Sequence, residues 1–291
     1  MKRIAFVTDS TACLSQAQQE HYGIEVVPLQ IVLGGESFRE GVDLRPSEYY
    51  QRLSQTKEFP TTSQPSVGEF AEVFERLLGT HESIVGLFLS SELSGTMNSA
   101  RQAADMVGGD IHIVDSRISS YGIAGPLMDG AELAQKGCGI EEILDLWREE
   151  LATMHAYFVV DTLEMLHRGG RIGGASAAFG AMLQIKPILT IQEGRIGLFE
   201  KIRTHRKAIE RISGLFDASM KERTDWQLGV VHSARENDAR NLRDELCAEY
   251  PGLMTDMSEL GPVIGSHTGP GVLALVYYQQ RLPGGRSWYE A

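Results

Sequence analysis

The segment SSELSGT, at residues 90–96, has the residue types and the position of an anion-binding site. It follows an apolar run at 84–89 and precedes a helical pattern, so a strand should end there and a helix begin. We expect Ser94 at the N-cap, because its hydroxyl and the free N–H groups of the first turn, near Gly95 and Thr96, then point to one place. The helix dipole favours a carboxylate or a phosphate there. The alternative is that Ser94 only caps its own helix.

The usual motifs of nucleotide binding and of serine catalysis are missing at this position. The segment has no lysine and does not match the GxxxxGK[ST] pattern of P-loops, and no GxGxxG follows a strand. Its serines do not lie in the GxSxG pattern of a nucleophile elbow. The sequence therefore predicts an anion site that belongs to none of these types.

A second polar segment is TTSQPS, at residues 61–66. Its last serine forms a capping box with Glu69, which accounts for that hydroxyl. The hydroxyls of Thr62 and Ser63 and the amide of Gln64 have no such role and are candidate ligand contacts. The alternative is a polar surface loop held by its proline.

Two further segments contain groups suited to an anion. Arg168 and Arg171 flank a Gly–Gly pair, and arginine forks suit carboxylates and phosphates. The alternative is a helix that ends at these glycines, with basic residues against its dipole. Residues 261–271 (GPVIGSHTGPG) predict a tight loop around His267, although a lone histidine is often only structural. No histidine, cysteine or carboxylate lies near His267 at ligand spacing, so we expect no zinc.

Residues 173–189 (GGASAAFGAMLQIKPIL) are small or apolar on nearly every side. A helix of that composition is either buried or lines an apolar cavity. Residues 173–185 are therefore candidates for the core or for the wall of an apolar tunnel.

Composition argues against several classes of protein. The 291 residues have a net charge of −12, which disfavours binding to nucleic acid and to anionic lipid headgroups. No apolar run approaches the ~18–20 residues of a membrane helix, and the N-terminus does not resemble a signal peptide. Three widely spaced cysteines, Cys13, Cys138 and Cys247, argue against disulfides. We therefore expect a cytoplasmic protein.

The elements that position these residues alternate between β and α patterns, which indicates an α/β fold. We expect strands at 4–8, 84–89, 111–114, 156–160, 226–232, 253–259 and 272–278, and a hairpin at 187–203. Residues 24–33, the turn Gly34–Gly35 and the polar stretch after it predict a hairpin or an excursion from the sheet. Helices are expected at 46–55, 67–78, 95–107, 120–136, 140–154, 204–222 and 236–249. Residues 1–155 should form a three-layer α/β/α domain with a parallel sheet, and residues 156–291 an α/β domain with a mixed sheet. Part of 24–60 should pack on the second domain.

Taken together, these segments resemble the DegV family of bacterial proteins. The matching motifs occur in family order: TDS at 8–10, TSQPS at 62–66, SSELSGT at 90–96 with SA at 99–100, GGRI at 169–172, KPIL at 186–189, RT at 203–204 and GPVIGSHTGPG at 261–271. Each motif is weak alone, but seven in this order are specific.

This resemblance implies a two-domain α/β protein that binds one long-chain fatty acid, such as palmitate, stearate or oleate, in a tunnel between the domains. It implies that Thr62 and Ser94 hold the carboxylate, with His267 close by. The neighbouring candidates for ligand contact are Ser63, Gly95 and Thr96. Arg171 would lie near the tunnel mouth, where the ligand is presented to a partner.

The partner implied by the resemblance is a separate fatty acid kinase related to dihydroxyacetone kinases. It would convert the bound fatty acid to an acyl phosphate for phospholipid synthesis. The chain itself would then be a carrier without catalysis and without a cofactor.

Two other functions compete with this one. An acyl hydrolase or acyltransferase could use Ser94 as nucleophile and His267 as base, with Asp9 or Asp115 orienting the histidine. A nucleic-acid-binding regulator is opposed by the acidic composition and by the lack of a basic helix.

Overall fold

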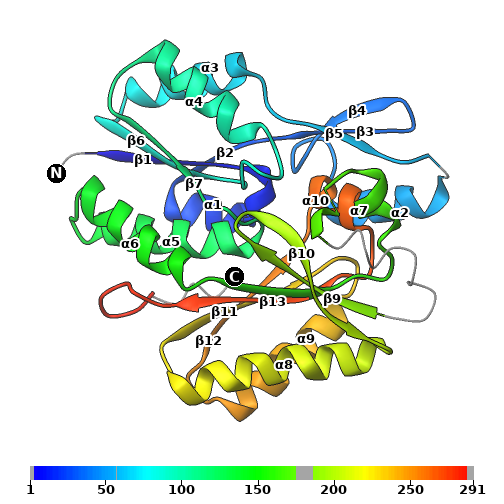
Figure 1. The fold of residues 1–291 in the computed structure, drawn as a ribbon. Coiled ribbons are helices and arrows are strands. Elements are labelled where there is room, and N and C mark those ends of the chain that lie inside the picture. Colours follow the sequence, from blue (N-terminus) through cyan, green and yellow to red (C-terminus); the bar gives the residue numbers. More distant parts are fainter. Residues whose placement is uncertain (1–2, 57, 175–185, 287–291) are drawn as a thin grey trace.

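The computed structural model describes residues 3–56, 58–174 and 186–286. In this part of the chain, two large β-sheets lie one above the other, with helices between and outside them (Figure 1). A small third sheet lies to one side. This α/β architecture, with one parallel and one mixed sheet, confirms the predicted fold class.

The four-stranded sheet is parallel throughout and has the order β2-β1-β6-β7. Its strands are β1 (Ile4–Asp9), β2 (Ile24–Val27), β6 (Ser83–Phe88) and β7 (Ile111–Asp115). Helices α3 (Val67–Leu78) and α4 (Thr96–Val107) pack together over one face. The capping box predicted before α3 is present, with Ser66 and Glu69 each bonded to the other's backbone. Strands β1 and β6 are apolar because both of their faces are covered.

The six-stranded sheet is mixed and has the order β10-β9-β8-β13-β11-β12. Its strands are β8 (His155–Val159), β9 (Lys186–Gln192), β10 (Arg195–Ile202), β11 (Trp226–His232), β12 (Met254–Glu259) and β13 (Leu273–Gln279). Helices α8 (His205–Glu222) and α9 (Glu236–Glu249) pack on one face. The predicted hairpin turn at residues 193–194 joins β9 to β10.

Helix α5 (Tyr121–Gln135) lies between the two large sheets and contacts both, and α6 (Ile140–Ala152) packs beside it. The approach to β11 is close, because a Cβ at Gly229 would lie 2.1 Å from the ring of Tyr121. One hydrophobic core therefore runs from Phe6 of the first sheet to Phe158 of the second. The division into domains at 1–155 and 156–291 stays a prediction.

The small sheet has the order β4-β3-β5 and is antiparallel. Its strands are β3 (Gln30–Leu33), β4 (Glu36–Arg39) and β5 (Thr61–Ser63). The hairpin predicted around Gly34–Gly35 is confirmed, because β3 and β4 pair on either side of that turn. Residues 24–33 divide into β2 and β3 near Pro28, which has no N–H to donate to a ladder. Helix α2 (Pro46–Gln55) packs on this sheet with the phenol of its Tyr50 bonded to Leu260 O, so part of 24–60 does contact the second half.

Three further short α-helices occur in the described residues, and one of them, which ends at the Gly–Gly pair, is the alternative given above for that segment. Helix α1 (Gln16–Tyr22) begins with a capping box of Ser15 and Gln18. Helix α7 (Glu164–Arg168) ends at the Gly–Gly pair, and α10 (Pro262–Thr268) occupies the segment that we expected to be a loop around His267. Of the small and apolar residues 173–185, which we expected in the core or in a tunnel wall, 175–185 lie outside the described part of the chain.

Within the part of the chain that the structure describes, no helix is both long and apolar enough to span a bilayer. The three cysteines are free thiols.

Candidate functional site

A cavity of about 360 Å³ lies between the two large sheets. Most of its wall is apolar. The six-stranded sheet contributes side chains from β8, β9, β10, β11 and β13: Ala156, Phe158, Ile191, Ile196, Val231, Ala274 and Val276. The other half of the chain contributes Leu29, Leu89, Leu93 and Ile118. The volume is within the range of small-molecule sites.

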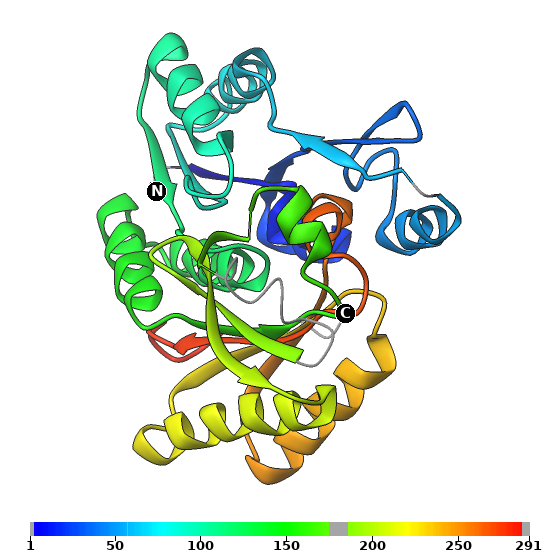
Figure 2. The ribbon, with the colours of Figure 1, turned by 45° about the vertical axis from the view of Figure 1, so that its right-hand side comes forward.

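Part of the same wall is polar, and it contains six of the candidate residues named from the sequence. They are Thr62, Ser63, Gln64, Ser94, Arg171 and His267. Gly95 and Thr96 adjoin Ser94 but, like Arg168, are not among the described residues that line the cavity. Segments far apart in sequence meet here because β5, the start of α4, and α10 beside α7 converge on one place (Figure 2).

Thr62 and His267 form a direct contact, with 2.8 Å between Thr62 Oγ1 and His267 Nε2. On its other side the imidazole packs against Gly169, where a Cβ would lie 2.3 Å from His267 Nδ1. That nitrogen is buried and has no hydrogen-bond partner among the described residues. Burial, and then the charge of Arg171, lower the pKa of His267 to about 4, so the ring is neutral at pH 7.

Ser94 is not the N-cap, which corrects the prediction. Helix α4 begins at Thr96, and the N-cap is Gly95. The Ser94 hydroxyl accepts a bond from the Thr96 N–H at 3.3 Å and lies 2.9 Å from the Thr96 hydroxyl. It therefore still lies at the positive end of the helix dipole, one residue earlier than expected.

Gln64 joins the two hydroxyl-rich segments. Its amide donates to Ser99 Oγ of α4 at 2.8 Å, and a Cβ at Gly95 would lie 2.0 Å from Gln64 Oε1. Glycine at 95 thus leaves room for the Gln64 side chain, which ties β5 to α4. From the sequence, Gln64 is a candidate ligand contact. Its tie to α4 is not visible there, because a helix and a strand separate the two segments.

Arg171 links the Gly–Gly turn to the serine-rich segment. Its guanidinium donates to Leu93 O at 3.2 Å and to Gly169 O at 2.8 Å, and its side chain is otherwise exposed. Arg168 lies outside the cavity wall, where it pairs with Glu164 and stacks 3.8 Å over the ring of Phe59. Of the two arginines, Arg171 is the one that lines the cavity.

The hydrogen bonds of a catalytic triad are not present in the described residues. Asp9 accepts bonds from Thr11 and from Leu89 N–H, and Asp115 accepts from Ser91 and from Arg117 N–H. Among the described residues, neither carboxylate bonds to His267, which bonds to Thr62. No group of three metal-ligating side chains occurs among the described residues either.

A family model described as an uncharacterised protein of the DegV family matches residues 3–280. A DegV domain-containing protein of Halalkalibacterium halodurans is 39% identical over 97% of this chain and 100% of its own length. Protein DegV of Bacillus subtilis is 38% identical over 94% of this chain and 98% of its own.

Solved structures of DegV family and fatty-acid-binding proteins are also similar to this chain. A fatty-acid-binding DegV family protein of Thermus thermophilus superimposes with a TM-score of 0.91 at 37% identity, covering 95% of this chain and 99% of its own. The B. subtilis DegV structure, described as a fatty acid binding protein, has a TM-score of 0.91 at 38% identity over 96% and 100%. A stearic-acid-binding protein of Eubacterium ventriosum has 0.88 at 27% identity over 96% and 98%.

The neutral state of His267 predicts a pH effect on stability. The unfolded chain binds a proton at this residue below its ordinary pKa of 6.5, whereas the folded protein does so only near 4. The free energy of unfolding should therefore fall as the pH drops through this window. In urea unfolding at pH 7 and pH 5, His267→Gln should remove about 2 kcal/mol of that fall. His112→Gln, on β7 outside the cavity, is the control. If the free energy of unfolding falls between pH 7 and pH 5 as much in His267→Gln as in the wild type, His267 is not kept neutral by the fold.

Proposed function

The chain belongs to the DegV family, and we propose that it binds one long-chain fatty acid in the cavity between its two large sheets. The observation that carries the proposal is the wall of that cavity, which is apolar over most of its area and has Thr62, Ser94 and His267 in its polar part. Palmitate, stearate and oleate are the expected ligands. The fatty-acid-binding relatives described above support this assignment.

The hydrogen bonds already present leave the two hydroxyl protons free for a carboxylate. A carboxylate only accepts, so Thr62 must donate to it. Thr62 Oγ1 can do so when it accepts from His267 Nε2–H, a tautomer that leaves the buried Nδ1 without a proton against Gly169. Ser94 Oγ accepts from the Thr96 N–H, and it keeps its own proton for the ligand when the Thr96 hydroxyl donates across their 2.9 Å contact. The neutral histidine thus orients Thr62.

Most of the affinity should come from the alkyl chain. Burial of a methylene group is worth ~0.8 kcal/mol, so a sixteen-carbon chain gains on the order of 10 kcal/mol before ordering costs. The two hydroxyls then set the position of the acid group. Helix α4 adds the favourable field of its N-terminus.

In this proposal the protein is a cytoplasmic carrier rather than an enzyme, and it needs no cofactor. A separate fatty acid kinase related to dihydroxyacetone kinases phosphorylates the exposed carboxylate to an acyl phosphate, which is used in phospholipid synthesis. Arg171, exposed beside the polar part of the cavity, contributes to this presentation. The lack of a serine–histidine–aspartate chain among the described residues supports a role in binding over one in hydrolysis.

The direct experiment is to identify what the protein carries. Protein purified from cells is extracted into organic solvent and analysed by mass spectrometry, with delipidated protein reloaded with palmitate or oleate in parallel. We expect close to one equivalent of a long-chain fatty acid. Protein that is empty and takes up neither acid would disprove the proposal.

Loss of either hydroxyl should weaken binding without abolishing it. A hydrogen bond to a charged group is worth ~1.5–3 kcal/mol, so Thr62→Ala and Ser94→Ala should each raise the Kd for palmitate by roughly 10- to 100-fold. Thr61→Ala, on the same strand but exposed, should bind as the wild type does. Equal affinities in all three variants, measured by calorimetry, would remove the hydroxyls from the site.

Arg171→Ala should separate binding from transfer. Because tail burial dominates affinity, the variant should retain palmitate within a few-fold of the wild type, while its phosphorylation by the kinase falls by tenfold or more. Arg168→Ala is the matched control, since it removes the same charge from the same turn. A cavity emptied by Arg171→Ala would show that the arginine serves binding instead.

A further inference from the structure

The floor of the first cavity, between the two large sheets, is one face of three neighbouring strands, β8, β13 and β11. Because side chains alternate along a strand, β13 and the residue before it place Val272, Ala274 and Val276 on this face. Val272 follows the short loop after α10, the helix of His267, and it marks the polar end of the floor. Val276 lies about 13 Å farther along the strand. The floor therefore runs from the polar end of the cavity inward.

Two small residues lie in this floor among larger apolar ones. Ala274 pairs with Phe158 across β13 and β8, and Ala156 pairs with Val276 one inward-facing position farther along. The two alanines are therefore diagonal neighbours, with Phe158 and Val276 at the other two corners. All four side chains are buried and line the cavity. The floor is thus lowest along the line from Ala274 to Ala156, between two larger side chains.

Beyond Val276, two tyrosines cover the floor. The next inward-facing residue of β13 is Tyr278, and its ring packs on α5, where a Cβ at Gly125 would lie 2.7 Å from it. The neighbour of Val276 on β11 is Gly229, and the ring of Tyr121 covers that position. Neither tyrosine is among the described residues that line the cavity. In the described part of the chain, the floor therefore ends at Val276.

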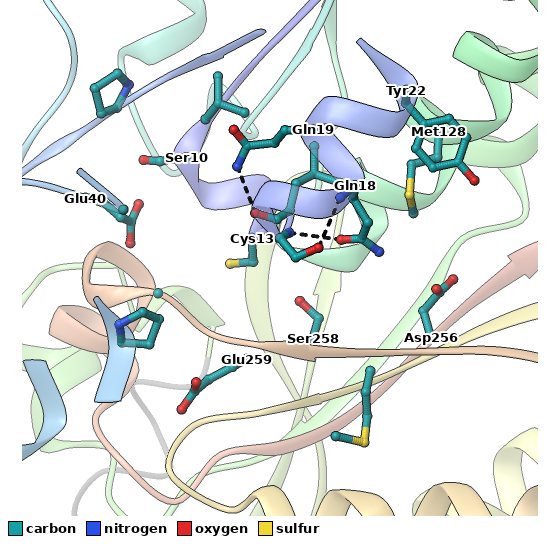
Figure 3. A pocket seen from close by; sticks show the side chains of 18 of the residues that line it. Ser10, Cys13, Gln18, Gln19, Tyr22, Glu40, Met128, Asp256, Ser258 and Glu259 are labelled. Carbon is teal, nitrogen blue, oxygen red and sulfur yellow. Dashed lines mark hydrogen bonds between the residues drawn. The ribbon is translucent and has the colours of Figure 1, made fainter. Parts of the chain in front are cut away.

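Both tyrosines are fixed by buried polar groups, and carboxylates lie behind them. The hydroxyl of Tyr278 donates to Asp129 at 2.5 Å, and that of Tyr121 donates to Asp256 at 2.6 Å. Asp256 and Glu259 line a separate cavity of about 630 Å³ beside α1 and β12 (Figure 3). That space shares no lining residue with the first cavity. An alkyl tail that entered it would desolvate charged groups, so we expect the tail to end before the tyrosines.

We infer that Ala274 and Ala156 determine which tail lengths the first cavity accepts, an inference that rests on the proposed fatty acid site. With the carboxylate at Thr62 and Ser94, a tail that runs inward passes Ala274 first and Ala156 later. Short tails reach only the first position, whereas long tails lie over both. The small side chain of Ala156 is therefore what gives the last carbons of a long tail their place.

The test measures the Kd of the delipidated full-length protein for decanoate, laurate, palmitate and stearate by isothermal titration calorimetry. Ala156→Leu should displace about two methylene groups of palmitate and of stearate, which raises their Kd roughly tenfold. The rise should shrink as the acid is shortened, and decanoate should bind within a few-fold of the wild type. Ala274→Leu, nearer the polar end, should weaken all four acids.

Ala218→Leu is the matched control, because this residue is exposed on α8, on the other face of the sheet, and it should change no Kd. Thermal unfolding without ligand checks that each variant is folded, and Ala156→Val decides the question if Ala156→Leu is not. A rise that is equal for decanoate and palmitate, or no rise for either, would overturn the role of Ala156 while fatty acid binding stands. Wild-type protein that binds none of the four acids would instead disprove the proposed function, and this inference with it.

Discussion

The six-stranded sheet is apolar on both faces, and the rest of the structure follows from the need to cover them. Alternate residues of its central strands point to opposite sides, so Val230 and Leu275 lie under α8 and α9 while Val231 and Ala274 face the other way. Helix α5 packs against part of that second face. The remaining part is the wall of the first cavity. An alkyl chain placed there would complete the cover that protein side chains leave unfinished.

The polar part of this cavity depends on contacts between segments far apart in sequence. Thr62 and His267 are 205 residues apart, and each has its position from a different short element, β5 or α10. The contact works because the histidine is neutral, packed against Gly169 and kept from protonation by burial and by Arg171. Helix α10 is itself held at its first turn by Glu40, whose Oε1 accepts from the Val263 N–H.

Local signals predicted most elements well. The capping box at Ser66, the proline that opens helix 46–55 and the turn at 193–194 each act within a few residues, so their outcome is visible in sequence. The same kind of signal, Ser15 with Gln18, was available for α1 and was missed. Helix α10 was mistaken for a loop because of its glycines. Gly265 is needed there for packing, since a Cβ would lie 2.6 Å from the Tyr50 hydroxyl.

For the candidate site, too, local sequence signals predicted some features and tertiary packing decided the others. Residue types and short-range order identified Thr62, Ser94, Arg171 and His267, and the family resemblance gathered them into one hypothesis. The tertiary structure alone decided that they line one cavity, that Ser94 precedes the N-cap, and that Asp9 and Asp115 are bonded elsewhere. The physical reason is range: caps and turns are settled by neighbours in the chain, whereas distances between side chains are settled by how sheets and helices pack.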